Sequence, residues 1–506
     1  MNKFLLTLLI TCLTSIPAIC ADFDSLQPAN PLAPKVIPDN TIAIPTKKVT
    51  LTHNDIHNQY AIAFNRFMQS NTKASYNDFK ILIQTMDDND FAYMKLAEYM
   101  ADIGFFDLSE LAGKQIKDKT ISDYLIGDTQ LYYFPSKKLK PDDEIYLGEV
   151  FANIIYNDQS REATAELIKN TELLANSDYA NFVASLGYLK SNDIIEAEKY
   201  INSALKMNPQ NLNYKKLKAE ILSQGKKPQN AIKIVSDIKQ QKLYTTDFIN
   251  KVNSLEQYVL YKSKKAYSEK MYHLGYYYYY ENEPAKAVRS FQSALSSKKK
   301  LNKDIYAILS RVYFDSEDYD KAQDSAQKAV KIDGNNSTAL LVLGDLSYRE
   351  GDFKTALKYY KDAERNNSSL PSIKIAQTYE QLGKVKKAYE IYENVIKKYN
   401  DCYIAYFKIA LKDKSKELAY LKKSLAININ YTEAWLELGR IAIEKKQFDE
   451  AKKYLKISKY IDENHYKYYY YQGVLAKNQG KNGKEYFEKS LSINPNYTPA
   501  KEELKI

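Results

Sequence analysis

Residues that could carry out catalysis or bind a metal are few and scattered along this chain. There are four His and three Cys among 506 residues. His53 and His57 are four residues apart and could place two metal ligands on one side of a helix, but no third ligand accompanies them. No phosphate-binding glycine loop, HExxH, GxSxG or paired-cysteine motif occurs in the sequence. We therefore predict a protein that is not an enzyme and that uses neither a metal nor another cofactor.

The remaining candidates for chemistry are isolated. Cys402 has no neighbouring His or Arg that would lower the pKa of its thiol, so we predict that it is unreactive. His273 and His465 lie inside predicted helices, and we expect both at the surface.

The positive charge of the chain consists almost entirely of lysine. Lys and Arg total 73 against 63 Asp and Glu, which gives a formal net charge of +10, and only seven of the basic residues are Arg. Arginine is the usual residue for bidentate recognition of guanine and of phosphate. The lysines are interspersed with acidic residues, so we predict solvated helix surfaces and no nucleic-acid partner.

The first residues predict export. A short basic start is followed by an apolar run over residues 4–16 and by small residues near Ala21, which is the pattern of a secretory signal peptide. We assign residues 1–21 to the signal peptide. Residues 22–52 contain five prolines and are predicted to form a flexible tether. The expected location is the periplasm of a Gram-negative bacterium, with secretion as the alternative, and the processed chain is expected to be soluble, with membrane association only through a partner.

Composition leaves a helical, well-packed protein as the expected class. With 15 Gly, 14 Pro and 3 Cys, collagen-like and disulfide-rich chains are excluded, and 13% aromatic residues exclude general disorder. Small and large residues then recur with a period of about 34, as the step from Ala322 to Ala356 shows. Three copies of the pattern are Leu343-Gly344, Ala356, Tyr360, Ala363; Leu274-Gly275, Ala287, Phe291, Ala294; and Leu438-Gly439, Ala451, Leu455.

These residues resemble the tetratricopeptide repeat, with Leu-Gly at its seventh and eighth positions, Ala at the twentieth and a large residue at the twenty-fourth. The resemblance implies an all-α fold, a right-handed superhelical solenoid of antiparallel helix pairs. Small residues at the eighth and twentieth positions would let the two helices of a pair approach closely. Because one pair cannot bury its apolar side alone, neighbouring pairs must stack.

The register of the repeat divides the chain. Degenerate repeats are expected over 53–238, an amphipathic connecting helix over 239–265, the regular array over 266–497 and a short capping helix over 498–506.

By the same resemblance, the first helix of each pair lines a concave groove with its second, fifth, ninth, twelfth and thirteenth residues. Tyr and Arg, which the groove would contain, are enriched at protein interfaces. The predicted groove residues are Tyr272, Tyr276, Tyr279, Tyr280, Arg311, Phe314, Asp315, Leu341, Asp345, Tyr348, Arg349, Arg440 and Glu444.

Two functions are consistent with such a groove. The first is a scaffold that binds a protein or an extended peptide during cell-envelope assembly or secretion. The alternative is a periplasmic scaffold that binds carbohydrate in polysaccharide export, because tyrosine rings stack on sugars. Structural packing of the tyrosines, which are used throughout the chain, is a third interpretation of the same residues.

Overall fold

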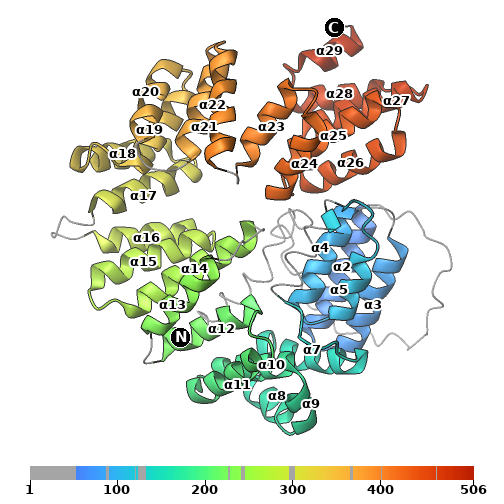
Figure 1. Ribbon diagram of the computed structural model, residues 1–506, viewed down its shortest axis with the longest axis vertical. Coiled ribbons are helices and arrows are strands. Elements are labelled where there is room, and N and C mark those ends of the chain that lie inside the picture. Colours follow the sequence, from blue (N-terminus) through green and yellow to red (C-terminus); the bar gives the residue numbers. More distant parts are fainter. Residues whose placement is uncertain are drawn as a thin grey trace, which may run out of the picture. The chain divides into compact units, whose positions relative to one another are not determined.

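The computed structural model describes residues 53–86, 90–119, 121–122, 133–225, 228–240, 246–295, 302–364, 369–399, 402–462 and 464–505. Within these ranges the regular secondary structure is helical and no strand occurs, as the ribbon in Figure 1 shows. The predicted all-α class, built from antiparallel helix pairs, is confirmed. The predicted signal peptide and the whole predicted tether lie outside the described residues.

The chain divides into two compact units, residues 1–214 with 430–506 and residues 215–429. We call them unit 1 and unit 2. Helix α12 (Leu212–Gln224) begins at the boundary. The other helices of unit 1 are α2 (His53–Met68), α3 (Thr72–Thr85), α4 (Asp90–Asp102), α5 (Phe106–Gly113), α7 (Pro141–Ile155), α8 (Ser160–Leu167), α9 (Thr171–Asn176), α10 (Asp178–Lys190), α11 (Ile194–Met207), α25 (Thr432–Glu444), α26 (Phe448–Ile461), α27 (Tyr466–Asn478), α28 (Lys484–Ile493) and α29 (Thr498–Leu504).

Unit 2 contains most of the regular repeats. Its helices are α13 (Pro228–Lys239), α14 (Thr246–Ser263), α15 (Tyr267–Tyr280), α16 (Pro284–Ala294), α17 (Asn302–Asp315), α18 (Tyr319–Ile332), α19 (Ser337–Arg349), α20 (Phe353–Ala363), α21 (Ser369–Gln381), α22 (Val385–Lys398), α23 (Tyr403–Lys412) and α24 (Glu417–Ile427). Of the expected connecting helix over 239–265, residues 246–263 form α14, and residues 241–245 lie outside the described residues.

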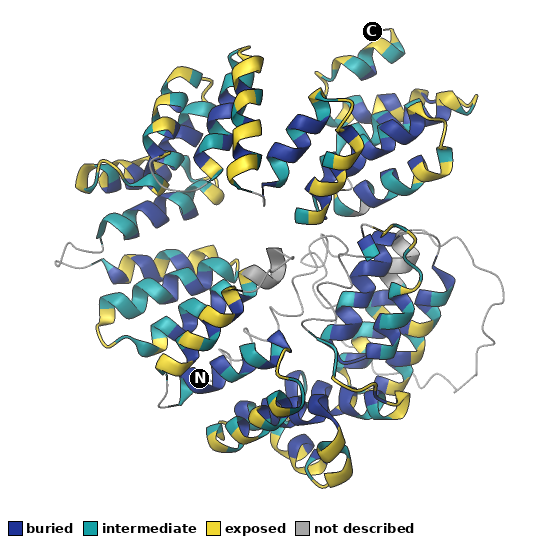
Figure 2. Ribbon diagram, in the orientation of Figure 1, coloured by how far each residue is buried: buried dark blue, intermediate teal, exposed yellow. Residues whose placement is uncertain are grey.

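Consecutive helices from α15 to α24 form pairs, and we call the first helix of each pair the A helix and the second the B helix. In the pairs from α17 to α24, the A helix buries more residues than its B helix, and A helices also contact each other, as α17 contacts α19. In α19 the buried residues are Ala339, Leu340, Val342, Leu343, Gly344, Asp345 and Leu346, whereas α20 buries only Ala356, Tyr360 and Ala363. Figure 2 shows this difference as a larger share of dark blue in α19.

The turn from an A helix to its B helix reverses the chain within three residues. After α17, the amide of Asp318 donates to the carbonyl of Tyr313 at 2.9 Å, and Glu317 adopts a left-handed conformation with φ 60°. This is the bonding of a Schellman motif, which satisfies the last carbonyls of the helix. Asp318 then caps α18 by accepting a hydrogen bond from the amide of Lys321.

The helices of a pair touch where the sequence has glycine. A Cβ added to Gly344 would lie 2.4 Å from the ring of Tyr360, and one added to Gly275 would lie 2.5 Å from the ring of Phe291. Each ring belongs to the B helix of the same pair. The small residue at the eighth position therefore allows the close approach that the sequence predicted.

In unit 1, helices far apart in sequence pack together. Helix α26 contacts α4, and Lys453 Nζ lies 2.6 Å from Oδ2 of Asp90, whose side chain is 1% exposed. The same carboxylate accepts hydrogen bonds from the backbone amides of Lys117 and Asp118. Residues 430–505 thus share a compact unit with the N-terminal helices, although their repeat pattern matches that of unit 2.

Within the described ranges, no helix combines the length and the apolar character needed to cross a lipid bilayer.

Replacing Gly344 by alanine is expected to lower the free energy of unfolding by about 1–3 kcal/mol, because the added methyl group forces the Tyr360 ring and α20 to shift. Urea denaturation of the full chain measures the change. Gly334 is the matched control, since no atom lies within 4 Å of a Cβ at that position. Equal stability of the Gly344→Ala and Gly334→Ala variants would show that the helices of the pair do not approach as described.

Candidate functional site

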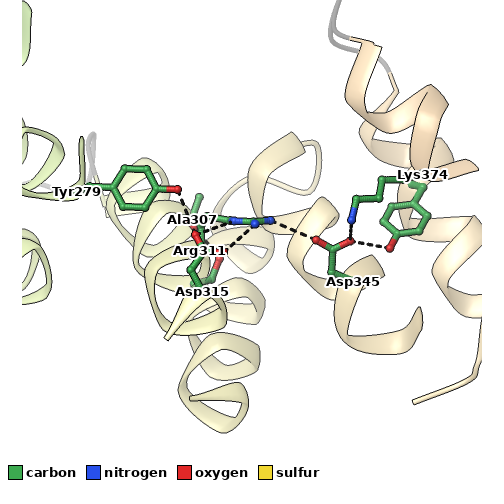
Figure 3. Close-up of polar contacts among 8 residues, drawn as sticks. Tyr279, Ala307, Arg311, Asp315, Asp345 and Lys374 are labelled. Carbon is green, nitrogen blue, oxygen red and sulfur yellow. Dashed lines mark hydrogen bonds and ion pairs between the residues drawn. The ribbon is translucent and has the colours of Figure 1, made fainter. Parts of the chain in front are cut away.

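A chain of polar side chains links four consecutive A helices of unit 2. We call it the polar ladder, and Figure 3 shows most of its contacts. It extends from α15 through α17 and α19 to α21, with one member from the B helix α20. Its residues are Tyr279, Arg311, Asp315, Asp345, Tyr360 and Lys374.

Asp345 is the central acid of the ladder. Its side chain is 5% exposed, and its two oxygens accept bonds from three directions. Oδ2 accepts a hydrogen bond from Nη1 of Arg311 at 3.2 Å. Oδ1 accepts a hydrogen bond from the hydroxyl of Tyr360 at 2.7 Å and lies 2.8 Å from Nζ of Lys374. One buried carboxylate thereby joins α17, α19, α20 and α21. Burial, followed by the charge of Asp345, raises the pKa of Tyr360, which keeps its hydroxyl a donor.

Arg311 connects Asp345 to the preceding helix. Its Nε donates to Oδ2 of Asp315 at 3.1 Å, and its Nη2 lies 2.7 Å from Oδ1 of the same residue, so this pair is bidentate. The hydroxyl of Tyr279 donates to Asp315 at 3.2 Å. Three of the five N–H groups of the guanidinium are used in these contacts. The side chain of Arg311 is 33% exposed.

The repeat period brings these residues together. Arg311 and Asp345 are 34 residues apart, so they occupy equivalent places on successive A helices. A helix of one pair packs beside the next A helix, and equivalent residues therefore become neighbours in space. The charges of the ladder neutralise one another, because the cations Arg311 and Lys374 balance the anions Asp315 and Asp345.

The other predicted tyrosines of α15 pack mainly against aromatic rings. Tyr276 lies 5.2 Å from the ring of Phe291 in an edge-on arrangement, and Tyr272 lies 5.1 Å from Tyr276. Tyr280 stacks on Tyr276 at 6.4 Å. Burial raises the pKa of all three hydroxyls. The contacts of Tyr272 and Tyr276 therefore agree with the third interpretation of the sequence, in which these tyrosines serve structural packing.

The predicted residues of α17 and α19 outside the ladder make local contacts. Phe314 lies beneath the guanidinium of Arg311, with 5.5 Å between the carbon and the ring centroid. Arg349 covers the ring of Tyr319 at 3.7 Å. Two further contacts are Tyr348 with Phe353, at 5.2 Å, and Leu341 with the core around Tyr360.

Two predicted residues belong to the other unit. Arg440 and Glu444 lie on α25 in unit 1 and pair with each other at 2.6 Å. Arg440 also pairs with Glu437, which accepts a hydrogen bond from Tyr471 on α27. This arrangement repeats the bond between the ninth and thirteenth residues that joins Arg311 to Asp315.

Sequence reasoning missed Lys374 and Tyr360, because neither occupies a position that the resemblance assigns to the groove. It also missed the ion pair of Lys408 with Glu380, at 2.7 Å, which joins α23 to α21. This pair and that of Asp345 with Lys374 join successive A helices at a separation of 28 or 29 residues, which is shorter than the repeat period of about 34.

The histidines are more enclosed than predicted. His273 is half-buried and its Nδ1 lies 2.9 Å from Oε1 of Gln257, while the side chain of His465 is 12% exposed. The expectation that both lie at the surface is therefore wrong. His53 and His57 fall in α2, where their side chains lie outside the description. Across the described ranges, no three His, Cys, Asp or Glu side chains group as a metal site.

Comparison with known proteins agrees with the repeat pattern. Family models described as tetratricopeptide repeat match residues 272–337 and 309–371, 373–401 and 432–465. These parts of the chain therefore contain tetratricopeptide repeats. The TPR repeat-containing protein MJ1428 of Methanocaldococcus jannaschii is 26% identical over 249 residues, in an alignment that covers 43% of this chain and 43% of that protein. The matched part thus spans less than half of this relative.

Two solved structures align with the chain at low identity. A chain of the APC/C hetero-tetramer Cut9–Hcn1 aligns with a TM-score of 0.44 and 13% identity, over 89% of this chain and 96% of that one. YrrB, described as a TPR protein with an unusual peptide-binding site, aligns with a TM-score of 0.25 and 18% identity, over 43% of this chain and 100% of that one.

Asp345→Asn is expected to lower the free energy of unfolding by about 2–3 kcal/mol, because Arg311 and Lys374 lose the charge that they share. Asp315→Asn is the matched control, since it removes an acid with a 35% exposed side chain from the same arginine. The control is expected to cost at most about 1 kcal/mol. Urea denaturation of both variants measures the difference, and equal losses would contradict the central role of Asp345.

Stability is expected to depend on pH through His273. Burial, followed by the charge of Lys264, lowers the pKa of its imidazole from 6.5 to about 4. The unfolded chain therefore takes up a proton on this residue between pH 6.5 and 4 before the folded chain does, so its contribution to stability is complete above pH 6.5 and is lost as the pH falls toward 4. The stability of His273→Gln, measured relative to the native sequence by denaturation at pH 7.5 and 4.5, should improve at the lower pH. An unchanged difference would contradict the assignment.

Proposed function

We propose that this protein is a non-catalytic scaffold that holds a protein or an extended peptide against the A helices of unit 2. The polar ladder and the neighbouring tyrosines would form the binding surface. Tetratricopeptide repeats support an interaction role, because each pair repeats the same exposed surface on the next A helix.

The observation that carries the proposal is that Arg311 is held in place by other side chains of the protein. Its guanidinium is fixed by Asp315 and Asp345 and lies over the ring of Phe314, while the side chain stays 33% exposed. A donor that is already ordered loses little conformational entropy when it binds a carbonyl or carboxylate of a partner. Tyr279 and Tyr280 provide half-buried rings with polar ends beside it, which is the composition of an interface hot spot.

The proposal includes the compartment. The signal pattern over residues 1–21 supports export, and with it a role in cell-envelope assembly or secretion in the periplasm. Fractionation of cells that express the chain with and without residues 1–21 tests this part separately from the binding surface.

Arg311→Gln combined with Tyr279→Phe is expected to reduce recovery of the partner at least tenfold, in crosslinking within the native host followed by mass spectrometry. Arg311→Gln removes the charged guanidinium fork, and Tyr279→Phe removes the hydroxyl donor while keeping the ring. Lys358→Gln combined with Tyr359→Phe, on the B helix α20, is the matched control with the same loss of charge. Circular dichroism checks that both variants remain helical.

Unchanged recovery of a specific protein by the folded Arg311→Gln, Tyr279→Phe variant would reject the ladder as the binding surface. Equal losses in the variant and in its control would reject it as well.

A further inference from the structure

The positive charge of the chain is concentrated in unit 2. Residues 215–429 contain 40 Lys and Arg against 25 Asp and Glu, a net charge of +15, whereas residues 53–214 contain 15 against 24, a net charge of −9. Residues 430–506 add 14 against 11. The lysines therefore do not simply alternate with acids along the whole chain, as the sequence analysis inferred. A unit with such an excess attracts anionic partners over distances near the Debye length.

One part of unit 2 places lysines around a single core cluster. The cluster is formed by α21, α22 and α23, and its buried residues include Ala388, Tyr392 and Ile409. Four partly buried tyrosines pack against its edge. They are Tyr379, Tyr389, Tyr399 and Tyr420.

A lysine ammonium lies over each of these rings. The distances from Nζ to the ring centroid are 5.7 Å for Lys361 and 6.0 Å for Lys387 over Tyr379, 4.4 Å for Lys412 over Tyr389, 5.0 Å for Lys398 over Tyr399 and 5.4 Å for Lys423 over Tyr420. These are cation–π contacts, in which the ring face attracts the ammonium charge. We call Lys361, Lys387, Lys398, Lys412 and Lys423 the lysine crown.

The crown differs from the other lysines of the unit in its partners. All five residues are exposed, and among the described residues none of them lies within ion-pair distance of a carboxylate. By contrast, Lys303, Lys321, Lys328 and Lys414 each pair with an acid at 2.5–2.8 Å. The crown therefore holds five ordered positive charges that no carboxylate of the described chain neutralises.

The arrangement restricts the chemistry of a partner. Lys387 and Lys398 are eleven residues apart on α22, which places them on the same side of the helix about 16 Å from each other. A single phosphate or carboxylate cannot span that distance, so the partner must carry several anionic groups along its length. The ring faces that lie under ammonium groups are not open for stacking on nucleobases or sugars, which single-stranded nucleic acids require.

Exposed apolar side chains on the helices of the crown region favour a polypeptide. Val385, in the first turn of α22, is 49% exposed, and Leu418, in the first turn of α24, is 43% exposed. Both lie close in sequence to crown lysines or to the exposed Lys416. A peptide that alternates acidic and apolar residues complements both the charges and these side chains.

We propose that the lysine crown is a docking surface for an acidic polypeptide segment that carries carboxylates over at least about 16 Å. None of its residues belongs to the polar ladder, so this surface is separate from the one in the proposed function. The two can be tested and can fail independently.

The test uses the full chain and fluorescent poly-L-glutamate at 0.15 M salt. Lys387→Gln, Lys398→Gln, Lys412→Gln and Lys423→Gln together are expected to weaken binding at least tenfold. The matched control carries Lys303→Gln, Lys321→Gln, Lys328→Gln and Lys414→Gln, which removes the same charge from the same unit. The control is expected to change the affinity less than threefold.

Equal weakening in the crown variant and in the control would overturn the proposal, because the attraction would then follow net charge alone. Tighter binding of single-stranded DNA, polygalacturonate or phosphatidylglycerol vesicles than of poly-L-glutamate would also overturn it, in favour of the polyanion that binds most tightly. Thermal denaturation of both quadruple variants checks that they are folded at the temperature of the assay.

Discussion

The close approach of two helices within each repeat is the constraint on which the rest of this structure depends. Gly344 and Gly275 leave no room for a side chain, because the rings of Tyr360 and Phe291 fill the space beside them. This contact fixes how far the B helix lies from the A helix, and hence where the next A helix packs. The spacing of one repeat then becomes the spacing of side chains such as Arg311 and Asp345 along the stack. A local steric requirement thereby sets the geometry of a polar surface several helices long.

Tyrosine serves three physical purposes in this chain, which explains why its abundance alone could not identify a site. Tyr360 fills the gap beside a glycine and uses its hydroxyl to bind a buried carboxylate. Tyr276 packs edge-on against another ring, as a core residue does. Tyr389 packs against the edge of a core cluster and also lies under the ammonium group of Lys412. Only the half-exposed rings beside fixed charges, such as Tyr279, combine the features expected at an interface.

Much of the fold followed from the sequence, because Leu-Gly, Ala and a large residue recur in register from Leu274 to Leu455. The N-terminal helices were harder to predict, since pairs such as α2–α3 replace the pattern with a bond from the hydroxyl of Ser75 to the carbonyl of Ala63. Tyr279, Arg311, Asp315 and Asp345 could be predicted from their positions within the repeat. Lys374 could not, because its role depends on the distance to Asp345 in the preceding repeat. Likewise, the partition of charge between the units could be counted only after the compact units had been defined.

The claim that one buried carboxylate couples successive repeats is tested most directly by a double-mutant cycle between Arg311→Gln and Asp345→Asn in the full chain. The free energies of unfolding of the two single variants, the double variant and the native sequence give the coupling energy between these side chains. A bond between neighbouring repeats predicts a coupling of about 1–2 kcal/mol, with a smaller value for the cycle between Asp315→Asn and Asp345→Asn. Additive losses, within about 0.3 kcal/mol, would contradict the account.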